Sequence, residues 1–168
     1  MPHRKLLTFG LSFIIAICFM GCSRAKNVAE DTSINLTKWT EIYQVTLDSY
    51  LEQDVALNEN IDFIAIDLTT LEFANENDKK TIVLWLEEKH VSVKDINLDG
   101  LKKEGLFDGK YIPNGVFLKI ITVTKNNDEI IIEGMKYRGV RAANWFETKW
   151  ELNDGVWKFV GTIMTMIS

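Results

Sequence analysis

The last third of the chain constrains the fold most, because four strand-forming segments follow one another there with only short turns between them. These segments span residues 116–124, 129–138, 144–152 and 156–167. The clearest turn is Asn153-Asp154-Gly155, since all three residue types tolerate positive φ and favour a tight hairpin. Strands joined by hairpins pair antiparallel, so the sequence predicts a four-stranded antiparallel meander.

Alternation of apolar and polar residues within this meander predicts which side chains share a face of the sheet. In residues 144–152, one face is expected to carry Phe146, Thr148, Trp150 and Leu152. In residues 156–167, we expect Trp157, Phe159 and Ile163 to face the same way.

The preceding half of the chain predicts helices mixed with short strands. Residues 39–57 carry apolar and aromatic side chains at intervals of three and four, which indicates an amphipathic helix capped by Thr37. We then expect a strand at residues 61–68, a helix ending at Lys89, a strand at 91–96 and a short helix at 98–106. The fold class is therefore α+β: N-terminal helices and a strand–helix–strand unit packed on a C-terminal four-stranded antiparallel meander.

The N-terminal stretch predicts the location of the protein. A short basic head that includes Arg4 and Lys5 precedes an almost wholly apolar segment, residues 6–20, and then Gly21-Cys22. The apolar segment is shorter than the roughly 20 residues of a transmembrane helix. It resembles a bacterial lipoprotein signal peptide whose lipobox is Phe19-Met20-Gly21-Cys22. The resemblance implies cleavage before Cys22 and a lipid on its thiol.

Three regions follow from this interpretation. Residues 1–21 form the signal peptide, residues 22–36 a polar, flexible tether, and residues 37–168 a single α+β domain. The expected location is the extracytoplasmic face of the cell membrane, with the lipid on Cys22 as the anchor.

Composition excludes several classes of function. Once Arg4 and Lys5 are removed, 17 basic residues face 24 acidic ones, a net charge of −7, which argues against binding nucleic acid. Cys22 is then the only cysteine, so the domain has no disulfide, thiolate metal site or cysteine nucleophile.

Two motifs invite a metal-binding interpretation, and neither supports one. Asp95-Ile96-Asn97-Leu98-Asp99-Gly100 matches the opening of a calcium loop, but the twelfth position is Leu106 in place of the bidentate Glu. We expect Asn97 or Asp99 to cap the helix that follows. His90, the only histidine after processing, lies at the end of the preceding helix. No cofactor, metal or catalytic residue is predicted.

The remaining candidate site is a cluster of cations in an otherwise acidic domain. Lys136, Arg138 and Arg141 surround the chain reversal at Gly139, and Trp145 follows closely. These residues predict an anion-binding or partner-binding patch. The alternative is a solvated hairpin rim without function.

Six segments of the chain carry a resemblance to a known class of protein: 63–68, 101–106, 136–139, 145–150, 153–158 and 162–168. Together they resemble small lipoproteins of Firmicutes, which implies a fold and a location rather than an activity. A curled sheet preceded by N-terminal helices is also similar to NTF2-like and cystatin-like cones.

The sequence therefore predicts a non-enzymatic lipoprotein that binds a protein partner or a small ligand outside the membrane. Two alternatives stay open: an enzyme that uses a carboxylate in a sheet pocket, and a regulatory or protective envelope protein.

Overall fold

The computed structural model describes residues 39–168. The predicted signal peptide, the lipidation site Cys22, the tether at residues 22–36 and the Thr37 cap lie outside the described residues.

The first helix ends earlier than the apolar pattern predicts. α1 spans Trp39–Glu52, and a separate 3₁₀ helix, η1, spans Val55–Asn58. Between them, Asp54 adopts the left-handed conformation with φ of 45°. A non-glycine residue with this backbone conformation cannot continue a right-handed helix, so the chain turns at Asp54.

Side-chain caps set the start of the next two helices. α2 spans Glu76–Lys89, and its capping residue Asn75 accepts hydrogen bonds from the backbone N–H groups of Asn77 and Asp78. α3 spans Leu98–Lys103, and Asn97 Oδ1 accepts from the backbone N–H of Gly100 at 2.9 Å. Of the two predicted capping residues, Asn97 is confirmed as the cap, and Asp99 lies in the first turn of the helix.

The six strands form one mixed sheet, and the α+β class with an antiparallel C-terminal meander is confirmed. The two strands of the strand–helix–strand unit do not form a separate layer: β1 pairs in parallel with β2 on one side and with β3 on the other. The order across the sheet is β2-β1-β3-β4-β5-β6. The strands are β1 Phe63–Ile66, β2 Ser92–Asp95, β3 Gly115–Lys125, β4 Glu129–Gly139, β5 Ala142–Asn153 and β6 Val156–Ile167.

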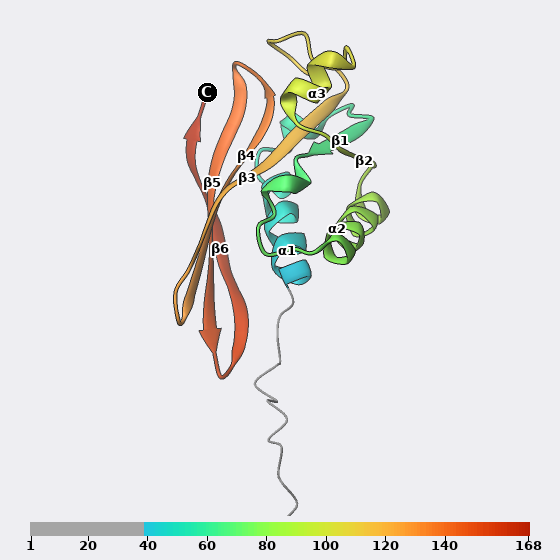
Figure 1. Ribbon diagram of the computed structural model, residues 1–168. Helices are drawn as coiled ribbons and strands as arrows, with labels where there is room; N and C mark the ends of the chain where they lie inside the picture. The colour runs from blue at the N-terminus through green and yellow to red at the C-terminus, as the bar shows by residue number, and fades with distance from the viewer. Residues whose placement is uncertain (1–38) are drawn as a thin grey trace, which may run out of the picture. The chain divides into compact units, whose positions relative to one another are not determined.

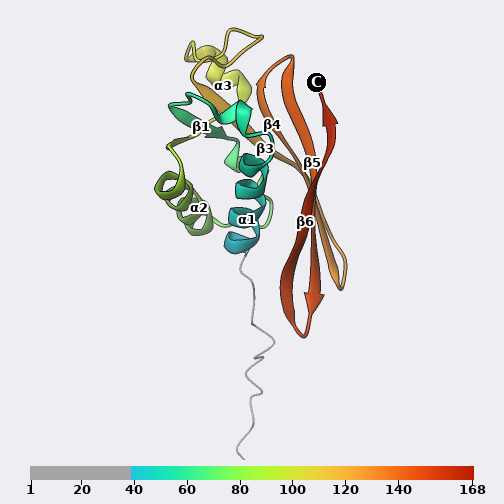
Figure 2. The ribbon, with the colours of Figure 1, turned by 180° about the vertical axis from the view of Figure 1, so that it is seen from behind.

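Helices pack on both faces of the sheet, and we name the faces by them. The inner face carries α1 and α2, with α1 between α2 and the C-terminal strands β5 and β6 in both views (Figures 1 and 2). Of the described α-helices, only α3 contributes to the core of the outer face, where Leu101 packs with Phe63, Ala65 and Phe117. The short 3₁₀ helix η2, Leu68–Thr70, leads from β1 toward α2.

Strict alternation holds in β5 but is wrong in β6. Phe146, Thr148 and Trp150 are all buried, as predicted. In β6, register shifts insert one extra residue before Gly161 and another before Met166. Ile163 therefore pairs with Glu147, on the outer face, whereas Phe159 pairs with Trp150, on the inner face.

A close approach of α1 to β4 generates a stability prediction. A Cβ added at Gly134 would lie 2.5 Å from Cε2 of Tyr50 and 2.8 Å from the carbonyl oxygen of Lys119. We expect Gly134→Ala to lower the free energy of unfolding by about 1–3 kcal/mol in urea titrations, because the core is overpacked. Gly161→Ala is the matched control, since a Cβ there meets nothing within 4 Å. Equal effects of the two substitutions would contradict this packing account.

Candidate binding surface

Lys136 is fully buried on the inner face and binds the chain between α1 and η1. Its Nζ donates to the backbone carbonyls of Gln53 and Asp54, the latter at 3.1 Å, and to Oδ1 of Asn58 at 3.3 Å. The carbonyl of Leu51 lies 3.5 Å away. Because the last carbonyls of a helix have no partner within it, this ammonium satisfies the C-terminal end of α1.

Arg138 binds the next part of the same segment. Its guanidinium donates to the carbonyls of Leu57 at 3.1 Å and Glu59 at 2.8 Å, and to the carbonyl of Pro113 at 3.0 Å. Only 8% of the residue is exposed, and its guanidinium lies 5.4 Å from the ring centroid of Tyr111. Arg138 therefore ties η1 and the loop before β3 to the sheet.

The four residues predicted as a binding patch do not share a surface. The patch and its alternative, a solvated rim, are both wrong for Lys136 and Arg138, because both side chains are buried and bound to carbonyls. Arg141 is exposed in the turn between β4 and β5. Trp145 pairs with Met135, which places it on the outer face, opposite to the side of Lys136, and it is half-buried there.

Trp145 belongs to a row of side chains that crosses the outer face. Lys119, Met135, Trp145 and Met166 occupy paired positions on β3, β4, β5 and β6. The first three are half-buried, and Met166 is 58% exposed. Beside them, Ile163 is 61% exposed. Adjacent exposed apolar residues of this kind mark interaction surfaces more often than isolated ones do.

An acidic pair lies next to this row. Glu133 and Glu147 are directly opposite each other on β4 and β5. Glu133 accepts a hydrogen bond from Thr122, but within residues 39–168 neither carboxylate lies within 4.0 Å of a basic nitrogen. Lys149 binds Glu129 and Glu151 instead. Like charges directly opposite on neighbouring strands lower stability.

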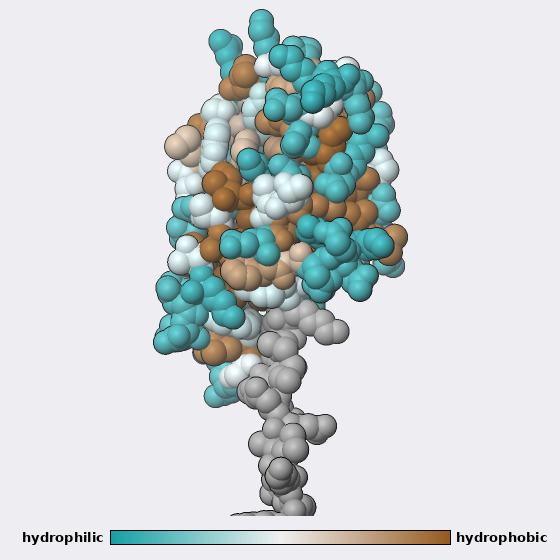
Figure 3. Space-filling model, viewed as in Figure 1, coloured by the Kyte–Doolittle hydropathy of each residue, from teal (hydrophilic) through white to brown (hydrophobic). Residues whose placement is uncertain are grey.

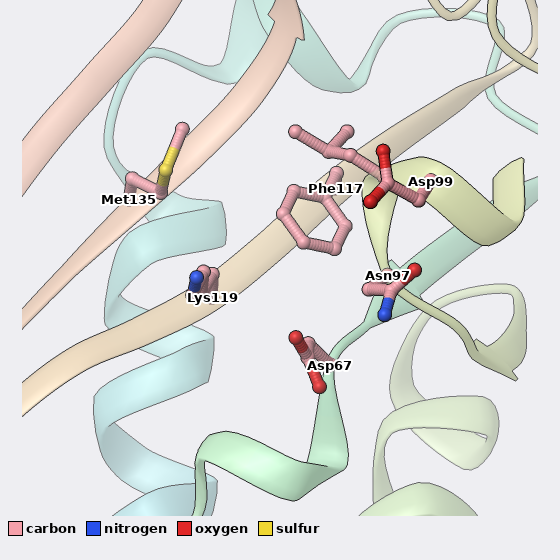
Figure 4. A pocket seen from close by; sticks show the side chains of 7 residues that line it. Asp67, Asn97, Asp99, Phe117, Lys119 and Met135 are labelled. Atoms are coloured by element: carbon pink, nitrogen blue, oxygen red, sulfur yellow. The ribbon is translucent and has the colours of Figure 1, made fainter. Parts of the chain in front are cut away.

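The row leads into an open groove of about 280 Å³ where β1 and β2 end. Asp67 follows β1 and Asn97 follows β2, and these two strands lead to helices on opposite faces of the sheet. Ligands commonly bind at such a point, outside the carboxyl ends of parallel strands. Figure 4 shows Asp67 below the ring of Phe117, with Asn97 and Asp99 beside it and Lys119 and Met135 on the opposite side.

The groove is lined by charged, polar and apolar side chains that can bind a ligand. Its lining has two carboxylates, one amide, one ammonium and three apolar side chains, and includes no serine, cysteine or histidine. Thr69 donates a hydrogen bond to Asp67 Oδ1. No ion pair within 4.0 Å involves Asp67, Asp99 or Lys119 among the described residues. These groups are therefore available to a ligand.

Together, the row, the acidic pair and the groove form one surface, which we call the outer binding surface. It comprises Asp67, Asn97, Leu98, Asp99, Phe117, Lys119, Glu133, Met135, Trp145, Glu147, Ile163 and Met166. Apolar residues also reach the surface between hydrophilic ones on the side of the molecule seen in Figure 3. Of the four residues predicted as a binding patch, the outer binding surface contains Trp145 alone.

His90 makes a structural contact away from the outer binding surface. It caps the C-terminal end of α2, where its Nε2 lies 2.9 Å from Oδ1 of Asp48, and Asp48 also binds Lys89. Within residues 39–168, no group of three or more His, Cys, Asp or Glu side chains is arranged to hold a metal ion. None of the helices in this range is long and apolar enough to cross a membrane.

Comparison of the chain with protein-family models, with curated proteins and with solved structures finds no match.

Burial of Lys136 generates a pH-dependent prediction. Desolvation lowers the pKa of Lys136 to about 8, and the negative charge of Asp54 partly offsets this shift. Between this value and the ordinary lysine pKa of about 10.4, the unfolded chain binds a proton that the folded chain has lost. The contribution of Lys136 to stability therefore rises with pH across this window.

Lys136→Met tests two properties of this side chain: its hydrogen bonds to backbone carbonyls and its lowered pKa. At pH 7 we expect it to lower the free energy of unfolding by about 2–4 kcal/mol, because several backbone carbonyls lose their donor. Between pH 8 and 10, the stability difference between the original protein and the variant should widen in urea titrations. A difference that stays constant or narrows would contradict the assigned direction of the pKa shift.

Proposed function

We propose that this chain is a lipid-anchored, extracytoplasmic binding domain without catalytic activity. Its ligand is a protein partner that contacts the outer binding surface with apolar and basic side chains. The anchor is the lipid on Cys22, and the polar residues that follow hold the domain off the bilayer.

One observation carries the choice of surface: uncompensated acidic groups lie beside exposed apolar side chains. The like-charge pair Glu133 and Glu147 costs the free domain stability, and a basic group from a partner would relieve that cost. Asp67 and Asp99 extend the acidic character into the groove. Net charge agrees with this choice, since residues 39–168 contain 14 basic and 22 acidic side chains.

The apolar part of the surface favours a protein over a small ligand. Met135 lines the edge of the groove, and Trp145 and Met166 continue the apolar row beyond it across two further strands. Tryptophan and methionine are enriched in the cores of protein–protein interfaces, where flat apolar surfaces meet. An open groove beside such a row suits a protruding basic side chain of the partner.

The anchor is tested by Cys22→Ala, with Cys18→Ala as the matched control inside the apolar core of the signal. We expect Cys22→Ala to abolish acyl labelling and to move the protein out of the membrane fraction or leave it as an unprocessed precursor. Cys18→Ala should change neither result. Acyl labelling that survives Cys22→Ala would contradict the proposed anchor.

The binding surface is tested by the double substitution Glu133→Gln and Glu147→Gln. Relief of like-charge repulsion should raise the free energy of unfolding by about 0.2–1 kcal/mol. The same variant should give a lower yield of partner complex after formaldehyde crosslinking of intact cells, because the basic groups of the partner lose their counter-charges.

The matched control is Glu88→Gln with Glu104→Gln, which removes the same charge from exposed positions outside the outer binding surface. It should leave the crosslinking yield unchanged. Equal yields from both double variants, or a greater loss from the control, would contradict the assignment of this surface.

A further inference from the structure

The two edges of the sheet are built differently. β2, at one edge, has only four residues, among them Lys94. The backbone N–H of Val93 donates to Oε1 of Glu87 at 3.1 Å, so a side chain occupies a backbone donor of this strand. Short length, a lysine and a covered donor are ways in which proteins prevent an edge strand from pairing with another chain.

β6, at the other edge, has little of this protection. It is twelve residues long, contains no proline, and carries a single charged residue, Lys158. From Lys158 to Ile167, no described side chain hydrogen-bonds to its backbone. Its apolar side chains are exposed, with Val160 at 54% and Ile163 at 61%. Such an edge can accept a further β-strand.

We propose that β6 pairs antiparallel with β6 of a second copy of this chain, so that one sheet runs through a two-fold symmetric dimer. The two-fold axis passes through Thr162. Because a two-fold axis perpendicular to a sheet preserves its faces, residues that meet across it must point to the same side. The argument for this dimer uses the edge of the sheet, and two residues of that edge, Ile163 and Met166, also belong to the outer binding surface.

The bulges of β6 favour this register. One register shift lies before Thr162, at Val160, and the other lies after it, at Thr165. Each half of the strand therefore contains one extra residue. When two copies run antiparallel, the two extra residues compensate each other, so that paired side chains at both ends of the strand point to the same face of the sheet. Against a regular strand, the same bulges would break the ladder.

Side chains that meet in this register are complementary. Gly161 has open space at its Cβ position, and it would lie opposite the exposed Ile163 of the second copy. The single charge, Lys158, would face Met166, so the two lysines of the dimer stay on opposite sides of the axis. The further pairs are Phe159 with Met164 and Trp157 with Ile167.

Light scattering of the full chain in detergent micelles, corrected for bound detergent, measures the oligomeric state. We expect a dimer, and Ile163→Lys should weaken it about a hundredfold, because the two-fold axis repeats the contact of Ile163 with Gly161 and the loss of each copy is worth roughly tenfold. Because Ile163 pairs with Glu147 within its own sheet, a lysine there leaves the fold intact. Ile121→Lys is the matched control: Ile121 is 46% exposed on β3, away from the edge, and its substitution should leave the dimer unchanged.

Thr162→Cys gives a second readout, because two copies would bring the same position together at the axis. We expect mild oxidation to form a disulfide-linked dimer of Thr162→Cys but not of the control Thr122→Cys, which is exposed on β3. A monomer at 0.1 mM and above, on the order of concentrations at which weak specific dimers form, would overturn the proposal. A dimer that withstands Ile163→Lys and yields no Thr162→Cys crosslink would overturn it as well.

Discussion

Two buried cations on β4 hold the helical layer to the sheet, and the rest of the structure depends on this contact. Lys136 and Arg138 donate to backbone carbonyls of the segment that leaves α1 and forms η1. Burying a charge is costly, and desolvation accordingly lowers the pKa of Lys136; the free carbonyls at the helix end offset part of this cost with fixed dipoles. The contact therefore supplies hydrogen-bond donors to the carbonyls at the end of α1. It also turns the chain toward β1 and places α1 against the inner face.

This contact also determines which face of the sheet is open. With α1 and α2 on the inner face, only α3 among the described α-helices adds to the core of the outer face, near β1 and β3. Trp145 and its methionine neighbours lie beyond α3 on this face. The cations predicted for binding thus serve the fold, and the side chains available to a partner are the acidic and apolar ones that alternate with them.

Patterns of adjacent residues predict the turns, the faces of single strands and the helix caps. The meander, the faces of β5 and the Asn97 cap each rest on a few adjacent residues, and all are confirmed. Asp154 and Gly155 both have positive φ, as their turn requires. The burial of Lys136 and Arg138 was also readable, because they share the even-numbered face of β4 with Ile130 and Ile132. The prediction of a surface patch relied on the positive charge of the two residues and not on this alternation.

Two kinds of feature could not be predicted from the sequence: bulges within a strand, and a site whose residues are brought together by the order of the strands. The extra residues in β6 reverse the direction of Ile163, and no local pattern marks a bulge there. The groove gathers Asp67, Asn97, Phe117 and Met135 from four segments that are adjacent only because β1 lies between β2 and β3. Likeness to small lipoproteins of Firmicutes, or to NTF2-like and cystatin-like cones, stays a prediction.

Site-specific photo-crosslinking in intact cells tests the central claim that the outer binding surface contacts a protein. A photoreactive amino acid in place of Trp145 is compared with the same amino acid in place of Leu84, which is 66% exposed on α2. The account predicts one discrete adduct from position 145, and none of that size from position 84. An adduct from position 84 alone, or no adduct from position 145, would contradict it.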